Sequence, residues 1–147
     1  MSDREKDWEE GLAVVAEQFS PEMAERLQTY TASQPFGAEI GELALKNAYL
    51  ALWLRDGLSK RDRSLVTVAM LIALHSEHEL HHHAQIAIQN GVTVEELEEL
   101  VYHATAYAGF PAASSGRSAI QQSLMDLGVI DQSRAGPLNT GRDKTDR

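Results

Sequence analysis

The sequence contains no cysteine. A chain without thiols forms no disulfide, no thiolate metal site and no cysteine nucleophile, which excludes thiol-based redox chemistry. Basic residues are also scarce, because 13 Lys and Arg stand against 22 Asp and Glu, for a formal net charge of −9. Such an acidic chain lacks the basic surface that binds phosphate backbones, so no nucleic-acid partner is expected.

Long hydrophobic runs are missing as well. No apolar run approaches about 18 residues, so the sequence predicts neither a membrane span nor a membrane partner. Residues 1–7 are too charged for a secretory signal, and a cytoplasmic location is the default expectation. The length of 147 residues, with 43% hydrophobic and 24% charged residues, is typical of one compact globular domain.

Strand signals are weak, and the hydrophobic periodicity is helical almost throughout. The pattern predicts an all-α fold, with one domain over residues 1–130 and a disordered polar tail over 131–147. Start signals such as Ser20-Pro21 and stop signals such as Asn90-Gly91 bound the predicted elements. The predicted helices cover residues 6–19, 21–30, 39–54, 59–74, 77–89, 93–108 and 112–127.

Two of these helices carry specific packing expectations. In the helix over 39–54, the residues at helical spacing predict the buried face, and they are Ile40, Leu43, Ala44, Asn47 and either Leu50 or Ala51. The helix over 59–74 is apolar all round between residues 65 and 74. We therefore expect it to be buried on every side, or to be covered in part by another subunit.

Five of the six histidines fall within nine residues: His75, His78, His81, His82 and His83. One interpretation is a zinc protease, because residues 78–82 match the HExxH pattern. On a helical wheel, however, His78 and His82 point away from the apolar stripe, and no third ligand follows at a fixed spacing. No metal site is therefore predicted. A second interpretation leaves His78, His81 and His82 solvated or in a subunit contact.

A third interpretation concerns Ser76, Glu79 and His83, which share one side of the predicted helix. A carboxylate four residues before an imidazole can orient it and stabilise its protonated form. His103 and Tyr107 flank the apolar stripe of the next helix in the same way. The two pairs predict a half-buried pocket at the border of the core. The alternative is that His103 and Tyr107 are core-edge residues with satisfied polar tips.

Three blocks of sequence resemble the carboxymuconolactone decarboxylase family, in the family's order and at its intervals. Residues 53–67 resemble W-x-R-x-G-L-S-x-R-x-R-S-L, residues 79–91 resemble E-L-x-x-H…A-x-x-N-G, and residues 103–113 resemble H-x-A-x-Y-A-G-x-P-A-A. The resemblance covers about residues 39–127. It implies an alkylhydroperoxidase-like, orthogonal bundle of six to seven helices that assembles as a homo-oligomer, either a trimer or a hexamer.

The resemblance also implies a reaction, the loss of carbon dioxide from 4-carboxymuconolactone or a related small lactone acid. This belongs to aromatic-acid breakdown through the β-ketoadipate route. No metal or organic cofactor is implied, because the unsaturated lactone itself takes up the electrons left behind. The superfamily's peroxidases use C-x-x-C-x-x-x-H, but Ser76 and Glu79 occupy the two cysteine positions before His83.

Site residues follow from the same resemblance. His83 is the expected general acid or base, Glu79 holds its tautomer and orientation, and either His103 or Tyr107 protonates the carbon or supports the lactone carbonyl. A second set is expected to bind substrate: Arg55, Arg61 and Arg63 as guanidinium partners of a carboxylate, Trp53 as a pocket wall, and Ser76.

Each substrate-binding residue has an alternative explanation, surface ion pairs with Asp56 or Asp62 for the arginines and core packing for the tryptophan. The chain also departs from the family, with His75-Ser76 where members commonly have Gly-Arg, and Ala51 where an acidic residue is common. These departures leave two alternatives open. In the first, the chain acts on another small acid or lactone, and in the second it is a catalytically idle, oligomeric binding protein.

Overall fold

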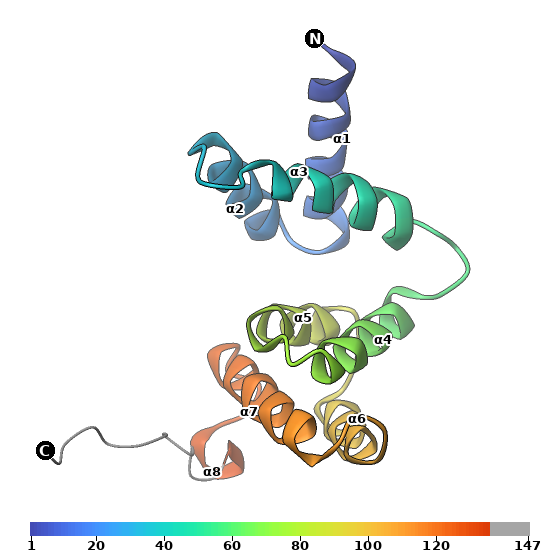
Figure 1. Ribbon diagram of the computed structural model, residues 1–147, viewed down its shortest axis with the longest axis vertical. Coiled ribbons are helices and arrows are strands. Elements are labelled where there is room, and N and C mark those ends of the chain that lie inside the picture. The colour runs from blue at the N-terminus through green and yellow to red at the C-terminus, as the bar shows by residue number, and fades with distance from the viewer. Residues whose placement is uncertain (136–147) are drawn as a thin grey trace, which may run out of the picture. The chain divides into compact units, whose positions relative to one another are not determined.

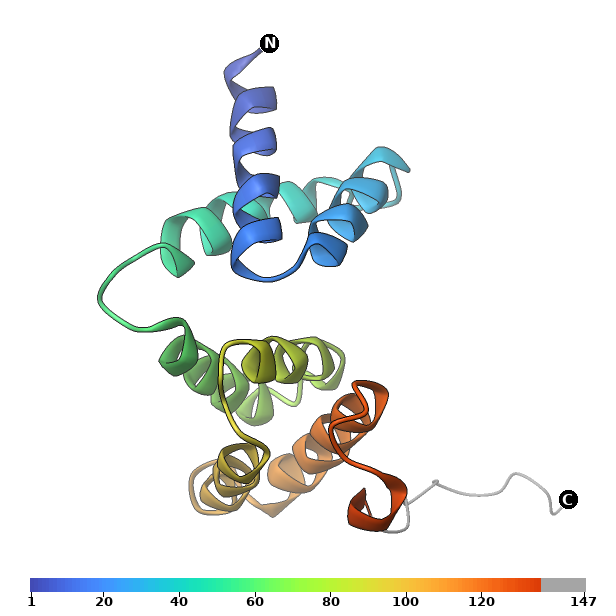
Figure 2. The same cartoon turned by 180° about the vertical axis from the view of Figure 1, so that it is seen from behind.

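The structure, a computed structural model, describes residues 1–135. Over these residues it contains eight α-helices, one π-helix and no strand, which confirms the all-α prediction. The chain divides into two compact units, Met1–Lys60 and Arg61–Arg147, and each is described by itself (Figure 1, with the reverse view in Figure 2). The prediction of one domain over 1–130 stays a prediction.

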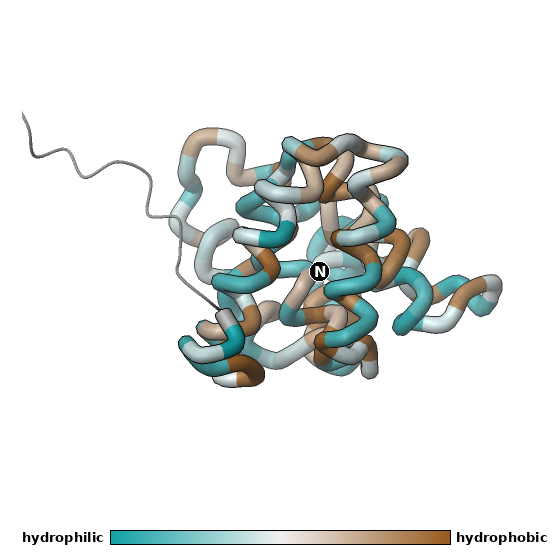
Figure 3. Tube along the Cα trace, turned by 90° about the horizontal axis from the view of Figure 1, so that it is seen from below, coloured by the Kyte–Doolittle hydropathy of each residue, from teal (hydrophilic) through white to brown (hydrophobic). Residues whose placement is uncertain are grey.

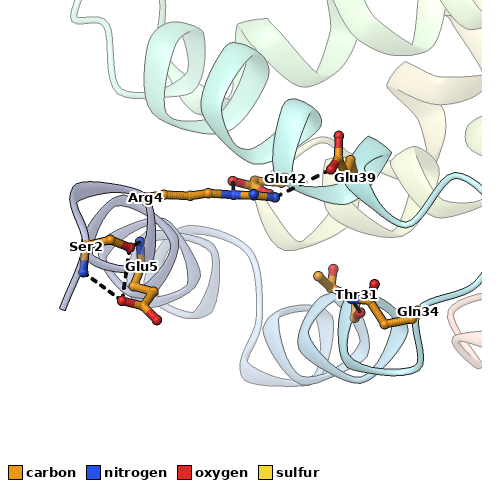
Figure 4. Close-up of polar contacts among 7 residues, drawn as sticks. All are labelled: Ser2, Arg4, Glu5, Thr31, Gln34, Glu39 and Glu42. Atoms are coloured by element: carbon orange, nitrogen blue, oxygen red, sulfur yellow. Dashed lines mark hydrogen bonds and ion pairs between the residues drawn. The ribbon is translucent and has the colours of Figure 1, made fainter.

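The first unit consists of α1 (Asp3–Gln18), α2 (Pro21–Ala32), α3 (Glu39–Ala44) and the π-helix η1 (Leu45–Trp53). Ser20 caps α2 as the sequence predicts, because its side chain accepts a hydrogen bond from the backbone N–H of Met23. Arg4 joins α1 to α3 through a two-pronged contact, with Nε 2.7 Å and Nη2 2.6 Å from the Glu42 carboxylate (Figure 4).

The buried face of the helix predicted over 39–54 was wrong. Ile40 and Leu43 are exposed, whereas Gly41, Leu45 and Tyr49 are buried. The buried residues are spaced by four and begin at Gly41, where the backbone lies close to Thr31 and Leu27 of α2. A glycine adds no apolar side chain to the sequence pattern, so the pattern alone did not place this face toward the core.

The second unit consists of α4 (Lys60–Ala73), α5 (Glu77–Gln89), α6 (Val94–Tyr107), α7 (Phe110–Asp126) and the short α8 (Gln132–Ala135). α7 packs against both α5 and α6, as both ribbon views show. The helix α8 lies within the predicted disordered tail, and the rest of that tail, residues 136–147, is outside the described residues.

The second unit has its own apolar core, built from α4 to α7. Hydrophobic and hydrophilic residues alternate along the helical trace, as expected of amphipathic helices (Figure 3). The buried residues of this core are Val68, Ile72, Leu80, Ala84, Ala87, Val92, Leu97, Val101, Ala104, Ala112, Ala113, Ile120 and Leu124. None of the helices in the described residues is long and apolar enough to cross a membrane.

Within the single chain α4 is not buried on every side, and its partial coverage by another subunit stays a prediction. Its buried residues Ser64, Val68 and Ile72 repeat every fourth position and define one face. On another face, Met70 is 60% exposed and Leu74 is 73% exposed. A helix that crosses the edge of a small core presents only one stripe to it, whatever the composition of its other side.

The turn from α4 to α5 places a histidine in the left-handed region. His75 has φ +52°, and the N–H of Ser76 donates to the carbonyl of Leu71 at 3.0 Å. This pattern ends a helix and favours glycine at the left-handed position. The glycine common here in the family that the sequence resembles therefore has a backbone explanation, and His75 is not required to contact a substrate.

Candidate functional site

The candidate site is centred on α5, which carries Glu79 and His83. Acidic residues in its first turn, Glu77 and Glu79, complement the positive end of the helix dipole. The helix ends at Gln89 with Asn90 as its C-cap, and Gly91 follows with φ +91°. Its buried stripe contains Leu80, Ala84 and Ala87, so the register of the histidines is fixed by core packing.

His83 is half-buried at the edge of that stripe. Its Nδ1 is buried and has no hydrogen-bond partner among the described residues. Burial lowers the pKa of the imidazole below its ordinary value, the Glu79 carboxylate offsets part of this shift, and His82 adds to it. The ring is therefore neutral at neutral pH in the free protein, with a polar atom available inside the fold.

Glu79 and Ser76 lie on the same side of α5 as His83, as their spacing predicts. Glu79 is exposed and acts on His83 through its charge. No hydrogen bond between Glu79 and His83 is present in the described part of the chain, so its role in holding the tautomer stays a prediction. Ser76 is half-buried, and its side chain does not cap the helix that it precedes.

The remaining histidines of α5 contact one another or α7. The rings of His78 and His82 meet edge to face with centroids 4.8 Å apart, and those of His81 and His82 at 5.6 Å. His81 bonds to Asp126 of α7, so it is not merely solvated. Across residues 1–135, no three His, Asp or Glu side chains are grouped so that they could hold one metal ion.

On α6, the His103 and Tyr107 rings stack on each other, with centroids 4.8 Å apart and an angle of 25° between their planes. Tyr107 is 83% exposed, so its hydroxyl is open to solvent rather than satisfied in the core. His103 borders an open groove of about 410 Å³ between α4 and α6. The other residues that line it are Leu65, Glu96, Glu99 and Leu100.

Arg61 lies at this groove, where the structure pairs it with carboxylates of the protein. Its guanidinium contacts Glu96, which lines the groove, and lies 3.6 Å from Asp62. Glu96 also closes the capping box of α6, since its other oxygen accepts the N–H of Thr93 at 2.9 Å. A substrate carboxylate would have to compete with Glu96 for Arg61.

The other predicted substrate-binding residues have different surroundings. Arg63 is half-buried on α4, and its carbonyl accepts a hydrogen bond from Thr67. Arg55 is exposed just after η1 in the first unit. Trp53 packs its ring edge to face against Phe19 at 4.8 Å, so the core explanation accounts for part of its surface.

The structure thus places the four residues predicted to act in catalysis in two groups. Glu79 and His83 interact on α5, and His103 and Tyr107 stack on α6. Neither a hydrogen bond nor an ion pair joins one group to the other within residues 1–135. Their convergence on one substrate stays a prediction.

Two buried serines escaped the sequence analysis. Ser64 of α4, 1% exposed, accepts a hydrogen bond from the side-chain amide of Asn90 at 3.0 Å. Ser123 of α7, fully buried, donates to the backbone carbonyl of His81 at 2.6 Å. Ser64 and Asn90 both lie in the motif blocks, which was an available signal. Ser123 follows Ile120 by three residues on the apolar side of α7, so its helical spacing was an available signal as well.

Comparison with known proteins gives a consistent result. The sequence profile of the Carboxymuconolactone decarboxylase family matches residues 38–122, more than half of the chain and all the predicted site residues. The 4-carboxymuconolactone decarboxylase of Acinetobacter baylyi is 37% identical over 97 residues, 66% of this chain and 72% of that protein. Nitrosuccinic acid decarboxylase npaB of Metarhizium robertsii is 36% identical over 93 residues, 63% of this chain and 65% of that protein.

Proposed function

The chain belongs to the carboxymuconolactone decarboxylase family, and we propose that it is a decarboxylase of a small carboxylic acid. The observation that carries the proposal is the half-buried His83, whose Nδ1 has no partner, beside the Glu79 carboxylate. The two named relatives support the reaction class. As substrate we propose 4-carboxymuconolactone or a closely related lactone acid.

The reaction breaks one carbon–carbon bond and forms one carbon–hydrogen bond. Carbon dioxide departs, and the electron pair that it leaves delocalises into the unsaturated lactone before the carbon takes up a proton. The substrate is its own electron sink, so we propose that no metal or organic cofactor takes part. The protein's task is to stabilise this developing charge and to supply the proton.

His83 is suited to supply that proton only after substrate has bound. In the free protein, burial keeps the imidazole neutral. A substrate carboxylate placed beside the ring favours the imidazolium, as a neighbouring negative charge raises a histidine pKa. His83 would then gain a proton on binding and deliver it to the carbanion. The Glu79 charge acts in the same direction.

The carboxylates of the substrate also need hydrogen-bond donors on the protein. We propose Arg55, Arg61 and Arg63 as candidates, with Ser76 and Trp53 as further contacts, and His103 or Tyr107 as the donor to the lactone carbonyl. On substrate binding, the Arg61 guanidinium would leave the Glu96 carboxylate and pair with a carboxylate of the substrate.

A second candidate substrate is nitrosuccinic acid, favoured by the relative of that name. A nitro group accepts an electron pair from a neighbouring carbon as a lactone does, so the same site chemistry would serve. The departures from the family pattern at Ala51, His75 and Ser76 bear on which of the two acids is the substrate. A catalytically idle binding protein remains the alternative from another class.

The deciding experiment is an assay of carbon dioxide release from 4-carboxymuconolactone and from nitrosuccinate at neutral pH without added metal. His83→Gln should lower the rate by roughly 10²–10⁴-fold, the usual contribution of a general acid. His78→Gln is the matched control, since it replaces an exposed imidazole on the same helix and should keep the rate.

Circular dichroism and light scattering would check that both variants keep their fold and the proposed trimer or hexamer. Full activity in His83→Gln would contradict the role of His83. No release from either acid by the folded wild type would contradict both substrates and favour the idle binding protein.

A further inference from the structure

The helix that carries His83, α5, makes two hydrogen bonds to α7, and both involve the same residue of α5, His81. The buried Ser123 hydroxyl donates to the His81 carbonyl at 2.6 Å. The His81 ring contacts Asp126, with Nε2 2.7 Å from Oδ2. Since the pKa of Asp126 is held below its usual value by His81 and Gln122, the carboxylate is the acceptor and Nε2 the donor.

These two contacts fix more than the distance between the helices. One contact holds the backbone of α5 and the other holds a side chain that projects from it, so together they resist rotation of α5 about its axis. Gln122 secures the second contact, because its amide donates to the other oxygen of Asp126 at 2.8 Å. Ser123 itself is fully buried, so loss of this contact would leave a buried polar group without a partner.

His81 and His83 lie on opposite sides of the buried stripe of α5. At about 100° per residue they are separated by about 200°, with Leu80, Ala84 and Ala87 in the smaller arc between them. α7 therefore holds one flank of the helix, and His83 occupies the other. A rotation of α5 that loosened the His81 contacts would carry the His83 ring along the edge of the core.

We propose that Ser123 and Asp126 are positioning residues, which act through His81 to fix the rotation of α5 and thereby the direction of the His83 imidazole. The inference rests on the proposed function for its effect on turnover. A rotation of about 10° displaces a group about 6 Å from the helix axis by about 1 Å. A misplacement of about 1 Å can lower a rate by about a hundredfold.

The test compares Ser123→Ala and Asp126→Ala with wild type. Asp126 is partly exposed, so its variant should fold even if the buried Ser123→Ala does not. Ser118→Ala is the matched control, because Ser118 also donates to a helix carbonyl, but it is exposed and this hydrogen bond stays within α7. Asp126→Asn removes the charge and keeps a hydrogen-bond acceptor.

The first readout is the pKa of His83 from its ring proton in NMR titrations without substrate, assigned by its loss in His83→Gln. Looser packing admits water, so Ser123→Ala and Asp126→Ala should raise this pKa toward its ordinary value. Loss of the negative charge of Asp126 alone would lower the His83 pKa, and the Asp126→Asn variant measures this effect. The sign therefore separates positioning from simple electrostatics.

The second readout is turnover. Both positioning variants should lower kcat by roughly ten- to a hundredfold with a smaller change in KM, and Ser118→Ala should change neither. A His83 pKa equal to that of wild type in both variants, with only a lower Tm, would overturn the proposal. Since the titration needs no substrate, it decides the proposal even if the wild type releases no carbon dioxide.

Discussion

At the scale of single residues, His83 combines a polar atom without a partner and a ring that is neutral in the free protein. Burying an unpartnered polar atom costs stability, so this position is less stable than an apolar residue of the same shape would make it. The same features leave the ring able to respond to a bound anion. Stability and reactivity are in conflict at this residue.

This conflict predicts a pH dependence of stability. The folded state disfavours protonated His83. The contribution of the neutral ring to the free energy of unfolding is therefore fully present above the pKa of the unfolded state, about 6.5. This contribution is lost as the pH falls through the lower pKa of the folded state. Between about pH 7.5 and about pH 5, the free energy of unfolding should decrease, and by less in His83→Gln.

Urea denaturation of both proteins at the two pH values measures this slope. Five carboxylates have a lowered pKa and contribute only at more acidic pH, below about 4.5: Glu5, Glu42, Glu95, Asp126 and Asp131. Equal slopes in wild type and His83→Gln would contradict a lowered pKa for His83.

At the scale of elements, close approach decides which residues are tolerated. α4 and α7 meet where Gly116 faces Ile72, a fully buried and β-branched side chain. A Cβ at Gly116 would lie 2.9 Å from Cγ1 and 3.2 Å from Cγ2 of Ile72. Neither helix can yield without disturbing the core that both share.

Gly116→Ala should therefore destabilise the protein. Overpacking costs about 1–3 kcal/mol, which exceeds the roughly 1 kcal/mol that alanine gains over glycine inside a helix. We expect a net loss of up to about 2 kcal/mol in urea denaturation. Gly41→Ala is the control, because its Cβ would lie 3.3 Å from the Thr31 hydroxyl and at an ordinary contact distance of 3.9 Å from Leu27, so stability should hold or rise. A Gly116→Ala variant as stable as wild type would contradict the close approach.

At the scale of the whole molecule, the two compact units differ in what they contain. The apolar core around Val68, Leu97 and Leu124 draws on the second unit, as do Glu79, His83, His103 and Tyr107. The first unit contains two of the predicted site residues, Trp53 and Arg55. It also has its own aromatic contacts, which Phe19 makes with Tyr49 and with Trp53.

An independent core predicts independent folding. A fragment of residues 61–147, expressed alone, should show a helical circular dichroism spectrum and a cooperative transition in urea. The full-length chain is the control for both signals. A fragment that is unfolded in buffer would contradict a self-sufficient second unit and would favour the single domain predicted over residues 1–130.

Features that depend on neighbouring residues could be predicted from the amino-acid sequence alone. The helices over 21–30 and 93–108 were predicted nearly as observed, because caps such as Ser20 and Thr93 act within one turn of their own helix. The pairing of Glu79 with His83, and of His103 with Tyr107, follows from a spacing of four on a helix. The motif blocks likewise indicated the family.

Features that depend on residues far apart in the sequence became known only from the folded chain. The Ser123 hydroxyl meets the His81 carbonyl across 42 positions of sequence, and no local pattern predicts that contact. The exposed face of α4 and the π-helical register of η1 depend in the same way on what packs against each helix. The lowered pKa of His83 follows chiefly from burial. Helical periodicity predicts that the residue lies near a core, but it does not predict how much water still reaches the ring.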